Sequence, residues 1–531
     1  MRDLASISAR PRVRWTATIL LLAVMAALLV SSGLHKRLVY DEYDNVSYGF
    51  RFLTKGPGVP PLGQRMPVLV FNALGCATSG CSKLTLDASE TTRLAVRAGS
   101  MVFALALALL LSIWAGRLFG PVGGLAALWL AVFDPTLLAH GKQVTSDVAV
   151  AFFMTAAVYA YWRWRERPRA LTIIACALAT AGAILSKFTG LLLVPILTLL
   201  VAIDLVRARG RDRTLTSAKN VGRGLAWAAA FAILVVAVIN AAYLFRGSFR
   251  SAADYQWESE AFRAHATWPV PIPLPRVFVQ GLDYSSWLEA RPDVARGYNY
   301  VLGQLNRDGR WYAFPLMVLL KTPLAVFVLI ALGARSPGPA GLGTLLAIPF
   351  AVVMAFFSLC VQPQLGIRYV LAAIPFLILA AARGAADLRG YRRWLAPLLL
   401  LWQAVSTLSY HPHFVPYFNE LIGRRVNAYR YLADSNLDWE DHGYDIERFQ
   451  HRHPEMSITI EPGDKPVPGW ILVGANGLVG IFEPERYRWL REGFLPVREV
   501  AYSHLLYYVP PEHIRTLPTA RERPSPSPSA H

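Results

Sequence analysis

Long apolar runs alternate with short polar connections along most of the chain. A helix needs about 20 predominantly apolar residues to cross the hydrocarbon core of a bilayer. About 11 runs approach that length, near residues 15–34, 94–115, 121–136, 147–164, 170–186, 188–206, 223–245, 312–333, 341–360, 368–388 and 394–410. We therefore expect a mainly α, polytopic membrane protein with about 11 transmembrane helices. Only Ser186-Lys187-Phe188 separates the fifth run from the sixth, so a broken or re-entrant helix there is the alternative.

The pattern changes after residue 411. Apolar and polar positions alternate in Ser457-Ile458-Thr459-Ile460 and Trp470-Ile471-Leu472-Val473, as is typical of short strands. We expect a transmembrane domain over residues 1–410 and a small α+β domain over 411–516. The Pro- and Ser-rich residues 517–531 are expected to be a disordered tail.

Composition and charge agree with a membrane protein. Only 17% of the 531 residues are charged, against about 25% in a soluble protein. A net charge of +18 would suggest nucleic acid in a soluble protein. Here the basic residues gather in every second loop, which indicates cytoplasmic loops instead. We expect no nucleic-acid partner, a cytoplasmic N terminus, and an outer side that receives residues 35–92, 246–311 and the chain after 411.

The common motifs for nucleotides and metals are absent from the sequence. It contains no GxxxxGK[ST], no GxGxxG followed by an acidic residue, no HExxH and no GxSxG. No two aspartates stand two positions apart, which excludes the Asp-x-Asp motif of many nucleotide-sugar enzymes. Any chemistry must therefore be built from residues at the outer face.

The first candidate is an acidic group directly after the first span. Asp41, Glu42 and Asp44 place three carboxylates within four residues. Such crowding raises the pKa of a carboxyl group, which suits a general base or a cation site. A solvated acidic turn that caps the following helix is the structural alternative.

A second polar group lies between the third and fourth spans. Asp134, His140, Lys142 and Asp147 fall within one short outer connection. Asp147 has the position of an N-cap for the fourth span, but capping explains one of these residues and not four.

Three cations stand at or below the outer interface. Lys187 separates two apolar runs, Lys321 lies within the eighth span just before Pro323, and Arg368 begins the tenth span. An ionisable residue at membrane depth indicates a functional site, although Lys187 has the alternative of reaching up to the interface. Fixed cations facing carboxylates suit a phosphorylated lipid with acid/base chemistry beside it.

Two further features of the outer side are the cysteines and an acidic stretch. Cys76 and Cys81 lie in the first outer loop, where an oxidising compartment favours a disulfide over free thiols. The stretch 434–442 is similar to a calcium loop, but Trp439 stands where an EF-hand requires glycine, so we reject that motif.

Together these features resemble the multi-spanning, lipid-carrier-dependent glycosyltransferases of the GT-C fold. More closely, the chain is similar to bacterial members of the protein O-mannosyltransferase-like family. The matching stretches are Asp41-Glu42, Leu138-Ala139-His140-Gly141, Thr145-Ser146-Asp147, Ser186-Lys187-Phe188-Thr189-Gly190, Lys321-Thr322-Pro323, Gly366-Ile367-Arg368-Tyr369, Tyr417-Phe418-Asn419-Glu420 and Asp434-Ser435-Asn436-Leu437-Asp438-Trp439.

The resemblance implies a reaction and roles for the residues. A sugar carried on polyprenyl phosphate is transferred, with inversion, to an acceptor hydroxyl at the outer face of the bacterial inner membrane. Asp41 falls on the family's catalytic base and Glu42 is its usual neighbour. Asp147 matches the second acidic position, while Lys187 and Arg368 would neutralise the lipid phosphate as it leaves. Asp44, His140 and Lys321 complete the expected substrate-binding set.

Some points stay open at this stage. The family tends to have Asp-Trp-Gly-Gln where this chain has Asp438-Trp439-Glu440-Asp441, which puts the role of that segment in doubt. No cofactor is certain, but a divalent cation shared by Asp41, Glu42, Asp44 and Asp147 is possible. The acceptor, whether lipid, glycan or protein, is not identified. A transporter or flippase of a lipid-linked saccharide is the alternative function, and a non-catalytic scaffold ranks last.

Overall fold

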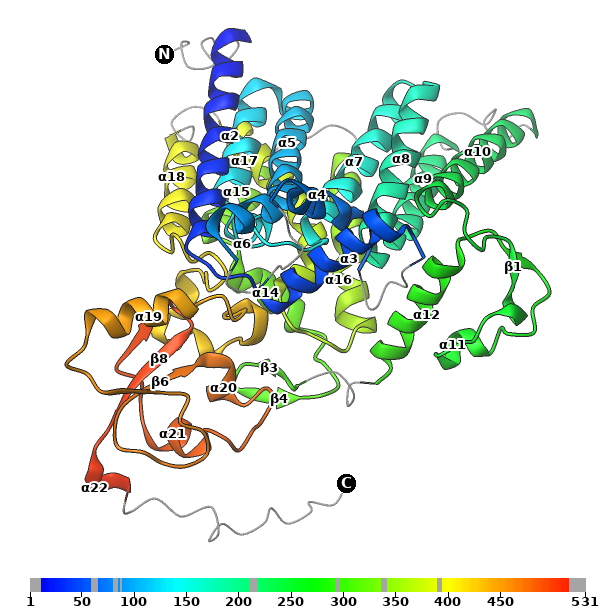
Figure 1. Cartoon of the computed structure of the whole chain (residues 1–531). Coiled ribbons are helices and arrows are strands. Elements are labelled where there is room, and N and C mark those ends of the chain that lie inside the picture. The colour runs from blue at the N-terminus through cyan, green and yellow to red at the C-terminus, as the bar shows by residue number, and fades with distance from the viewer. Residues whose placement is uncertain are drawn as a thin grey trace, which may run out of the picture.

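The apolar runs form helices that pack side by side into a bundle (Figure 1). The computed structural model describes residues 11–58, 65–79, 85, 88–209, 218–291, 297–335, 341–388 and 394–514. The bundle helices are α2 (Pro11–Leu34), α5 (Glu90–Val132), α7 (Asp147–Glu166), α8 (Ala170–Ser186), α9 (Leu193–Arg209), α10 (Ala218–Ala242), α14 (Ala313–Lys321), α15 (Leu324–Ala334), α16 (Leu342–Cys360), α17 (Ile374–Asp387) and α18 (Leu395–Leu408). Each of the expected runs lies in one or two of these helices, so the mainly α fold class is confirmed.

Several of these helices are long and apolar enough to cross a membrane. Among the described residues six pass on length and composition, or seven if the bent pair α14 and α15 is one span. The helices α8 and α18 are apolar but shorter. The multi-pass membrane character expected from the sequence is therefore supported, while this criterion gives a smaller number of spans than the expected 11.

Two of the expected runs lie within the single long helix α5, which folds back at Gly120. Gly120 has a left-handed backbone with φ of 77°, and Pro121 follows it. A Cβ on Gly124 would lie only 3.0 Å from the Cα of Gly116, whereas a straight helix would separate these residues by about 12 Å. The expected division of this region into runs near 94–115 and 121–136 corresponds to the two sides of that turn.

The helices are interrupted where the sequence places its deep cations. Lys187 has an extended backbone between α8 and the 3₁₀ turn η3 (Phe188–Leu192), which leads into α9. Lys321 ends α14, and Pro323 begins the 99° bend into α15. Arg368 lies in the 3₁₀ segment η6 (Ile367–Ala373) before α17. Broken helices at membrane depth are stable only where protein or a water-lined cavity surrounds them, so these breaks indicate a site.

The outer loops gather at one end of the bundle, on the side of the C-terminal domain (Figure 1). The first contributes α3 (Tyr40–Lys55), η1 (Pro67–Leu69) and α4 (Val70–Ser79). The long loop 246–311 contributes β1 (Arg250–Ser251), η5 (Ala252–Asp254), α11 (Glu260–Arg263), β2 (Pro271–Ile272), α12 (Arg276–Glu289), β3 (Asn299–Val301) and β4 (Gln304–Asn306). Their common position agrees with the sidedness inferred from the basic loops.

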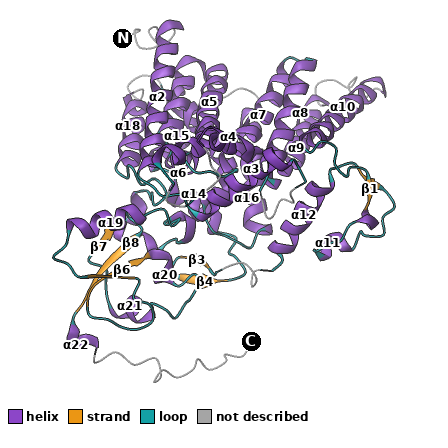
Figure 2. Cartoon of the chain, in the orientation of Figure 1, coloured by secondary structure: helices purple, strands orange, loops and turns teal. Residues whose placement is uncertain are grey.

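A four-stranded sheet forms the centre of the C-terminal region (Figure 2). Its strands are β5 (Ile458–Ile460), β6 (Gly469–Gly474), β7 (Arg498–Val500) and β8 (His504–Val509), in the order β5-β6-β8-β7. The β5–β6 pair is parallel and the other two pairs are antiparallel. With them go α19 (Gly443–Arg452), α20 (Ala475–Val479), α21 (Arg488–Gly493) and α22 (Pro511–Ile514). This is the small α+β unit that the alternating pattern predicted, and the expected tail 517–531 lies outside the described residues.

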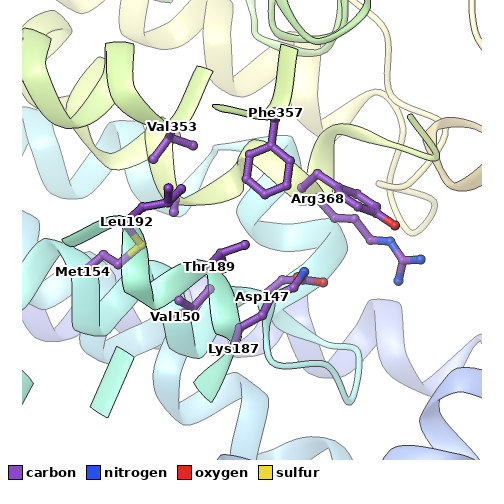
Figure 3. Close-up of a pocket in the computed structure, with 11 residues that line it drawn as sticks. Asp147, Val150, Met154, Lys187, Thr189, Leu192, Val353, Phe357 and Arg368 are labelled. Carbon is purple, nitrogen blue, oxygen red and sulfur yellow. The ribbon is translucent and has the colours of Figure 1, made fainter. Parts of the chain in front are cut away.

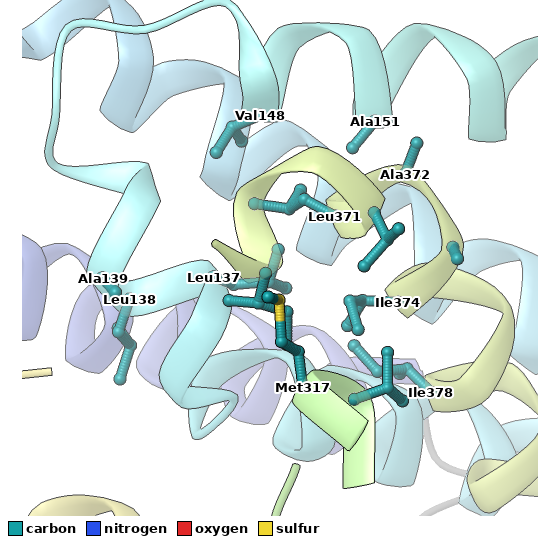
Figure 4. Packing of buried hydrophobic residues seen from close by; sticks show 14 of the residues in the cluster. Leu137, Leu138, Ala139, Val148, Ala151, Met317, Leu371, Ala372, Ile374 and Ile378 are labelled. Carbon is teal, nitrogen blue, oxygen red and sulfur yellow. The ribbon is translucent and has the colours of Figure 1, made fainter. Parts of the chain in front are cut away.

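A tightly packed core holds the outer ends of the helices together (Figure 4). Leu137 of α6 (Pro135–Gly141), Val148 of α7, Met317 of α14, and Leu371 and Ile374 near the start of α17 are all at most 1% exposed. Because close-packed interiors resist small displacements, this core gives the polar loops beside it a fixed geometry.

Candidate active site at the outer end of the bundle

A small pocket, here called the first cavity, lies between α7, η3, α16 and η6 (Figure 3). Its polar side carries Asp147, Lys187, Thr189, Arg368 and Tyr369. Its other side is apolar, and the lining there consists of Val150, Met154, Leu192, Val353, Phe357 and Ala372. The cavity is therefore amphipathic, with charged groups at one side and hydrocarbon at the other.

Asp147 and Lys187 form a buried ion pair in this cavity. The Nζ atom of Lys187 donates to Oδ1 of Asp147 at 2.7 Å, and both side chains are less than a tenth exposed. Lys187 Nζ also lies 5.2 Å from the centre of the Tyr369 ring. This ion pair thus connects the start of α7 with the break after α8.

Asp41 and Arg368 meet nearer to the solvent. Nη1 of Arg368 lies 3.3 Å from Oδ2 of Asp41, whose side chain is 48% exposed. The guanidinium of Arg368 stands 4.2 Å from the centre of the Trp439 ring, a cation–π distance. Asp41 is thus a carboxylate held by one partner and open on its other side, at the beginning of α3.

Glu42 lies in an entirely different environment. Its side chain is fully buried and forms a bidentate pair with Arg97 of α5, at 2.8 Å and 2.7 Å. The backbone N–H groups of Val39 and Val144 donate to the same carboxylate, each at 3.1 Å. With four donors on two oxygens, Glu42 joins the first outer loop to the 142–147 connection and has no access to a substrate.

Lys321 and His140 line a second small cavity. Nζ of Lys321 donates to the carbonyl oxygens of Val415 and Asn436, at 2.7 Å and 2.6 Å. Burial lowers the pKa of His140 to about 3, so its ring is neutral. The His140 ring lies 5.5 Å from that of Trp439. The expected substrate-binding set is therefore divided between two neighbouring cavities.

The remaining sequence candidates take separate positions. Asp44 pairs with Arg65 within the first outer loop. Cys76 is disulfide-bonded, as expected, and Cys81 lies outside the described residues.

The four carboxylates considered as a shared cation site do not share a position. Asp41 pairs with Arg368 and Asp147 with Lys187. Glu42 pairs with Arg97 and Asp44 with Arg65, as described above. Each carboxylate thus has a different protein cation, and the geometry favours a site whose positive charge comes from side chains.

The segment whose role the sequence left in doubt contributes directly to the site. Trp439 stacks on Arg368, and Asp434 and Glu440 interact electrostatically with Asp41. Burial raises the pKa of Asp434 to about 6 and also raises that of Glu440. Both residues have left-handed backbones, with φ of 58° and 62°, and such conformations concentrate at functional sites. The sequence feature that drew attention to this segment was Asp438-Trp439-Glu440-Asp441 in place of the family's Asp-Trp-Gly-Gln.

A buried charge network fastens this segment to the membrane domain. Lys36, just after α2, lies 3.0 Å from Asp445 and 3.5 Å from Asp441. Lys142 lies 3.1 Å from Asp441. Although burial opposes ionisation, these two lysines hold the pKa of Asp441 well below its usual range. The network therefore fixes 438–445 against the loops that carry Asp41 and Asp147.

Two sets of side chains in this network have the spacing of metal ligands: His413, His442 and Asp445, and Asp438, Asp441 and His442. The Lys36 ammonium contacts His442 and Asp445 of the first set. The Nδ1 atom of His442 thus already has the Lys36 ammonium as a hydrogen-bond partner. Lys36 is therefore a cation inside this network, although Nδ1 of His413, Oδ1 of Asp441 and Nε2 of His442 have no hydrogen-bond partner among the described residues.

Comparison with known families agrees with the sequence motifs. Residues 82–250, about a third of the chain, match the family described as dolichyl-phosphate-mannose-protein mannosyltransferase. The resemblance inferred from the sequence is confirmed for this part. No curated protein matches the chain significantly.

Solved structures with a similar arrangement include ArnT from Cupriavidus metallidurans, in the apo state and bound to undecaprenyl phosphate. Each is 13% identical, covering 92% of this chain and 97% of ArnT, with a TM-score of 0.46. Another is the oligosaccharyltransferase AglB from Archaeoglobus fulgidus, in complex with an inhibitory peptide and a dolichol-phosphate. It is 12% identical, covering 76% of this chain and 55% of AglB, with a TM-score of 0.46.

Proposed function

We propose that this protein is a membrane glycosyltransferase that moves a sugar from a polyprenyl-phosphate carrier to an acceptor hydroxyl, with inversion. The reaction takes place at the outer face of the bacterial inner membrane. The N terminus is cytoplasmic and the C-terminal domain is periplasmic. The observation that carries the proposal is the contact of Asp41 with Arg368 at the solvent side of an amphipathic cavity.

The lining of the cavity combines side chains suited to the two parts of such a donor, a phosphate and a hydrocarbon chain. Lys187 and Arg368 are fixed cations at its polar side, where they would stabilise the negative charge of the departing lipid phosphate. The apolar side, with Met154 and Phe357, suits the first part of a polyprenyl chain. Lys187 has Asp147 as its ion-pair partner at 2.7 Å.

Asp41 has the position of the general base. Its exposed side faces the solvent from which an acceptor would approach, while Arg368 connects it to the phosphate side. In the proposed step, the acceptor oxygen attacks the anomeric carbon as the bond to the phosphate oxygen breaks. The acceptor proton passes to Asp41, and the phosphate leaves with its negative charge against Arg368 and Lys187.

The test is sugar transfer by the purified full-length protein in detergent. Radiolabelled polyprenyl-phosphate sugars would be supplied with the wild type, Asp41→Asn and a control, Glu447→Gln, whose carboxylate pairs with Arg37 on the outer surface. Transfer by the wild type and the control, but not by Asp41→Asn, supports the proposal. A chelator added to the same reactions shows whether a divalent cation is needed.

The opposite result would favour the transporter. If none of the three proteins transfers sugar from a panel of donors while all bind polyprenyl phosphate, the enzyme proposal fails. Movement of a labelled lipid-linked saccharide across proteoliposomes would then identify a flippase, since transport does not require the carboxylate of Asp41.

A further inference from the structure

The outer end of α10 presents large apolar side chains to the surroundings. Residues Gly222–Ala242 qualify as a membrane span, and the chain then enters a turn over 243–250, here called the outer turn. Within it Leu244, Phe245 and Phe249 are 64%, 56% and 61% exposed. Arg246 and Arg250 are exposed in the same turn. Apolar and basic side chains thus alternate just beyond the end of the span.

The backbone conformation of the outer turn is unfavourable for the large side chains that occupy it. The N–H of Phe245 donates to the carbonyl of Asn240 at 2.8 Å and so closes the end of α10. Leu244 and Phe245 both have left-handed backbones, with φ of 53° and 55°. Glycine usually fills such helix-ending positions, because a Cβ atom disfavours them. These large side chains gain little burial within the chain, so another environment must stabilise them.

The inner side of the turn is firmly attached to the site domain. Tyr243 is fully buried, and its ring packs edge-on against Phe52 of α3 at 5.9 Å and Phe278 of α12 at 6.2 Å. The helix α3 is the one that carries Asp41 in its first turn. The position of the outer turn therefore sets the position of the first outer loop.

We infer that the outer turn lies in the headgroup region of the outer leaflet, with Leu244, Phe245 and Phe249 directed toward the acyl boundary. Large apolar side chains such as Phe and Leu insert at the boundary between headgroups and acyl chains. Arg246 and Arg250 are exposed in the same turn, and basic side chains at such a position extend from apolar surroundings to lipid phosphates. The turn anchors α3 and α12 at the membrane surface. The inference does not depend on which reaction the protein catalyses.

The β1–β2 pair, which follows the outer turn, offers a position for comparison within the same loop. The N–H of Phe249 donates to the carbonyl of Ile272 at 2.8 Å, which joins the turn to the β1–β2 pair. Trp268, before β2, is 58% exposed. In Figure 1, β1 and α11 lie farther from the helical bundle than the end of α10. We expect contact with lipid to decrease from Phe245 to Trp268.

The experiment measures depth with a fluorophore. The substitution Cys360→Ser in the full-length protein removes the exposed free thiol. Cys176 is buried and can remain. Phe245→Cys in this background is labelled with bimane and reconstituted in nanodiscs with spin-labelled lipids. The matched control is Phe482→Cys, which is 65% exposed in the C-terminal domain. We expect headgroup and 5-doxyl lipids to reduce the fluorescence at 245 at least about twofold, and that at 482 little.

The opposite outcome is equally defined. If iodide in the water quenches the two labels equally and the spin-labelled lipids quench neither, the outer turn stands in water and the inference is wrong. A protein partner would then be the next candidate for this surface. Should Phe245→Cys not yield a monodisperse protein, Leu244→Cys replaces it, because that side chain is more exposed and belongs to the same turn.

Discussion

Asp41 and Glu42 are neighbours at the start of α3, yet they occupy opposite environments. Asp41 contacts one arginine and is 48% exposed, whereas Glu42 is fully buried beneath four donors. Successive residues of a helix point about 100° apart, so one carboxylate faces the cavity mouth and the other faces the protein. The difference shows that the residue type of a carboxylate does not reveal its role until the orientation of its helix is known.

The sharpest test of this difference is the loss of each carboxylate in turn. Asp41→Asn is expected to reduce sugar transfer by about 10² to 10⁴, the usual contribution of a general base. Its thermal unfolding should remain close to that of the wild type, because an exposed pair contributes only about 0 to 1 kcal/mol. Transfer rates and unfolding midpoints in detergent measure the two effects. A variant with nearly full activity would remove Asp41 from the mechanism.

Glu42→Gln should have its main effect on stability. Removing one partner of a buried ion pair costs about 3 to 5 kcal/mol, because Arg97 remains charged and unpaired. The measurement is the unfolding midpoint of the purified protein. The double variant Glu42→Met, Arg97→Met is the control, and it should recover part of the loss. If Glu42→Gln unfolds like the wild type but transfers no sugar, Glu42 would take a catalytic role instead of a positioning one.

The cation beside Asp41 should matter for the phosphate. Arg368→Lys keeps the charge but loses the planar fork and much of the stacking on Trp439. We expect the affinity for polyprenyl phosphate to fall by about tenfold, or ~1.4 kcal/mol. Binding of a fluorescent polyprenyl phosphate measures it, with Asp41→Asn as a variant that should bind at least as well as the wild type. Unchanged affinity would place the phosphate elsewhere.

The smallest expected effect is a pH dependence from Asp434. Its pKa is raised to about 6 by burial, so it is neutral below that pH and ionised above it. Ionisation puts a negative charge near Arg368, and phosphate binding should weaken as the pH rises through about 6. Burial of Asp434 also links its ionisation to folding. The stability that the neutral carboxyl group contributes is fully present below its pKa in the unfolded chain, and it is lost as the pH rises through its pKa in the folded protein.

Asp434→Asn should remove this dependence. Between pH 5 and 7 we expect polyprenyl-phosphate affinity of the wild type to fall by about threefold, or ~0.6 kcal/mol, and that of the variant to stay level. A wild-type profile that is already flat would contradict the role given to Asp434.

Part of the site was accessible from the sequence. Asp41, Asp147, Lys187 and Arg368 were predicted because charged residues next to apolar runs stand out, and the structure brings all four to one cavity and its mouth. Trp439 was not predicted as a site residue. An aromatic residue does not stand out in a segment that contains both apolar and charged residues. Its contact with Arg368 also joins positions 71 residues apart in the chain.

The grouping of the candidates was the part that only contacts could decide. Lys321 and His140 belong to a second cavity because the 99° bend after α14 turns Lys321 toward Val415 and Asn436. Nothing in the spacing of the sequence specifies that direction. The same holds for Asp441, whose partners Lys36 and Lys142 come from two distant loops.

By itself the sequence determined the helical membrane architecture and the small C-terminal sheet, because the length of an apolar run and the alternation of apolar and polar residues are local properties of the chain. The tertiary structure decided which carboxylate is sealed by Arg97 and which stays open at the cavity, and how the 434–445 segment completes the site. These features depend on helix orientation and on contacts between distant segments, where burial and charge pairing outweigh any local preference.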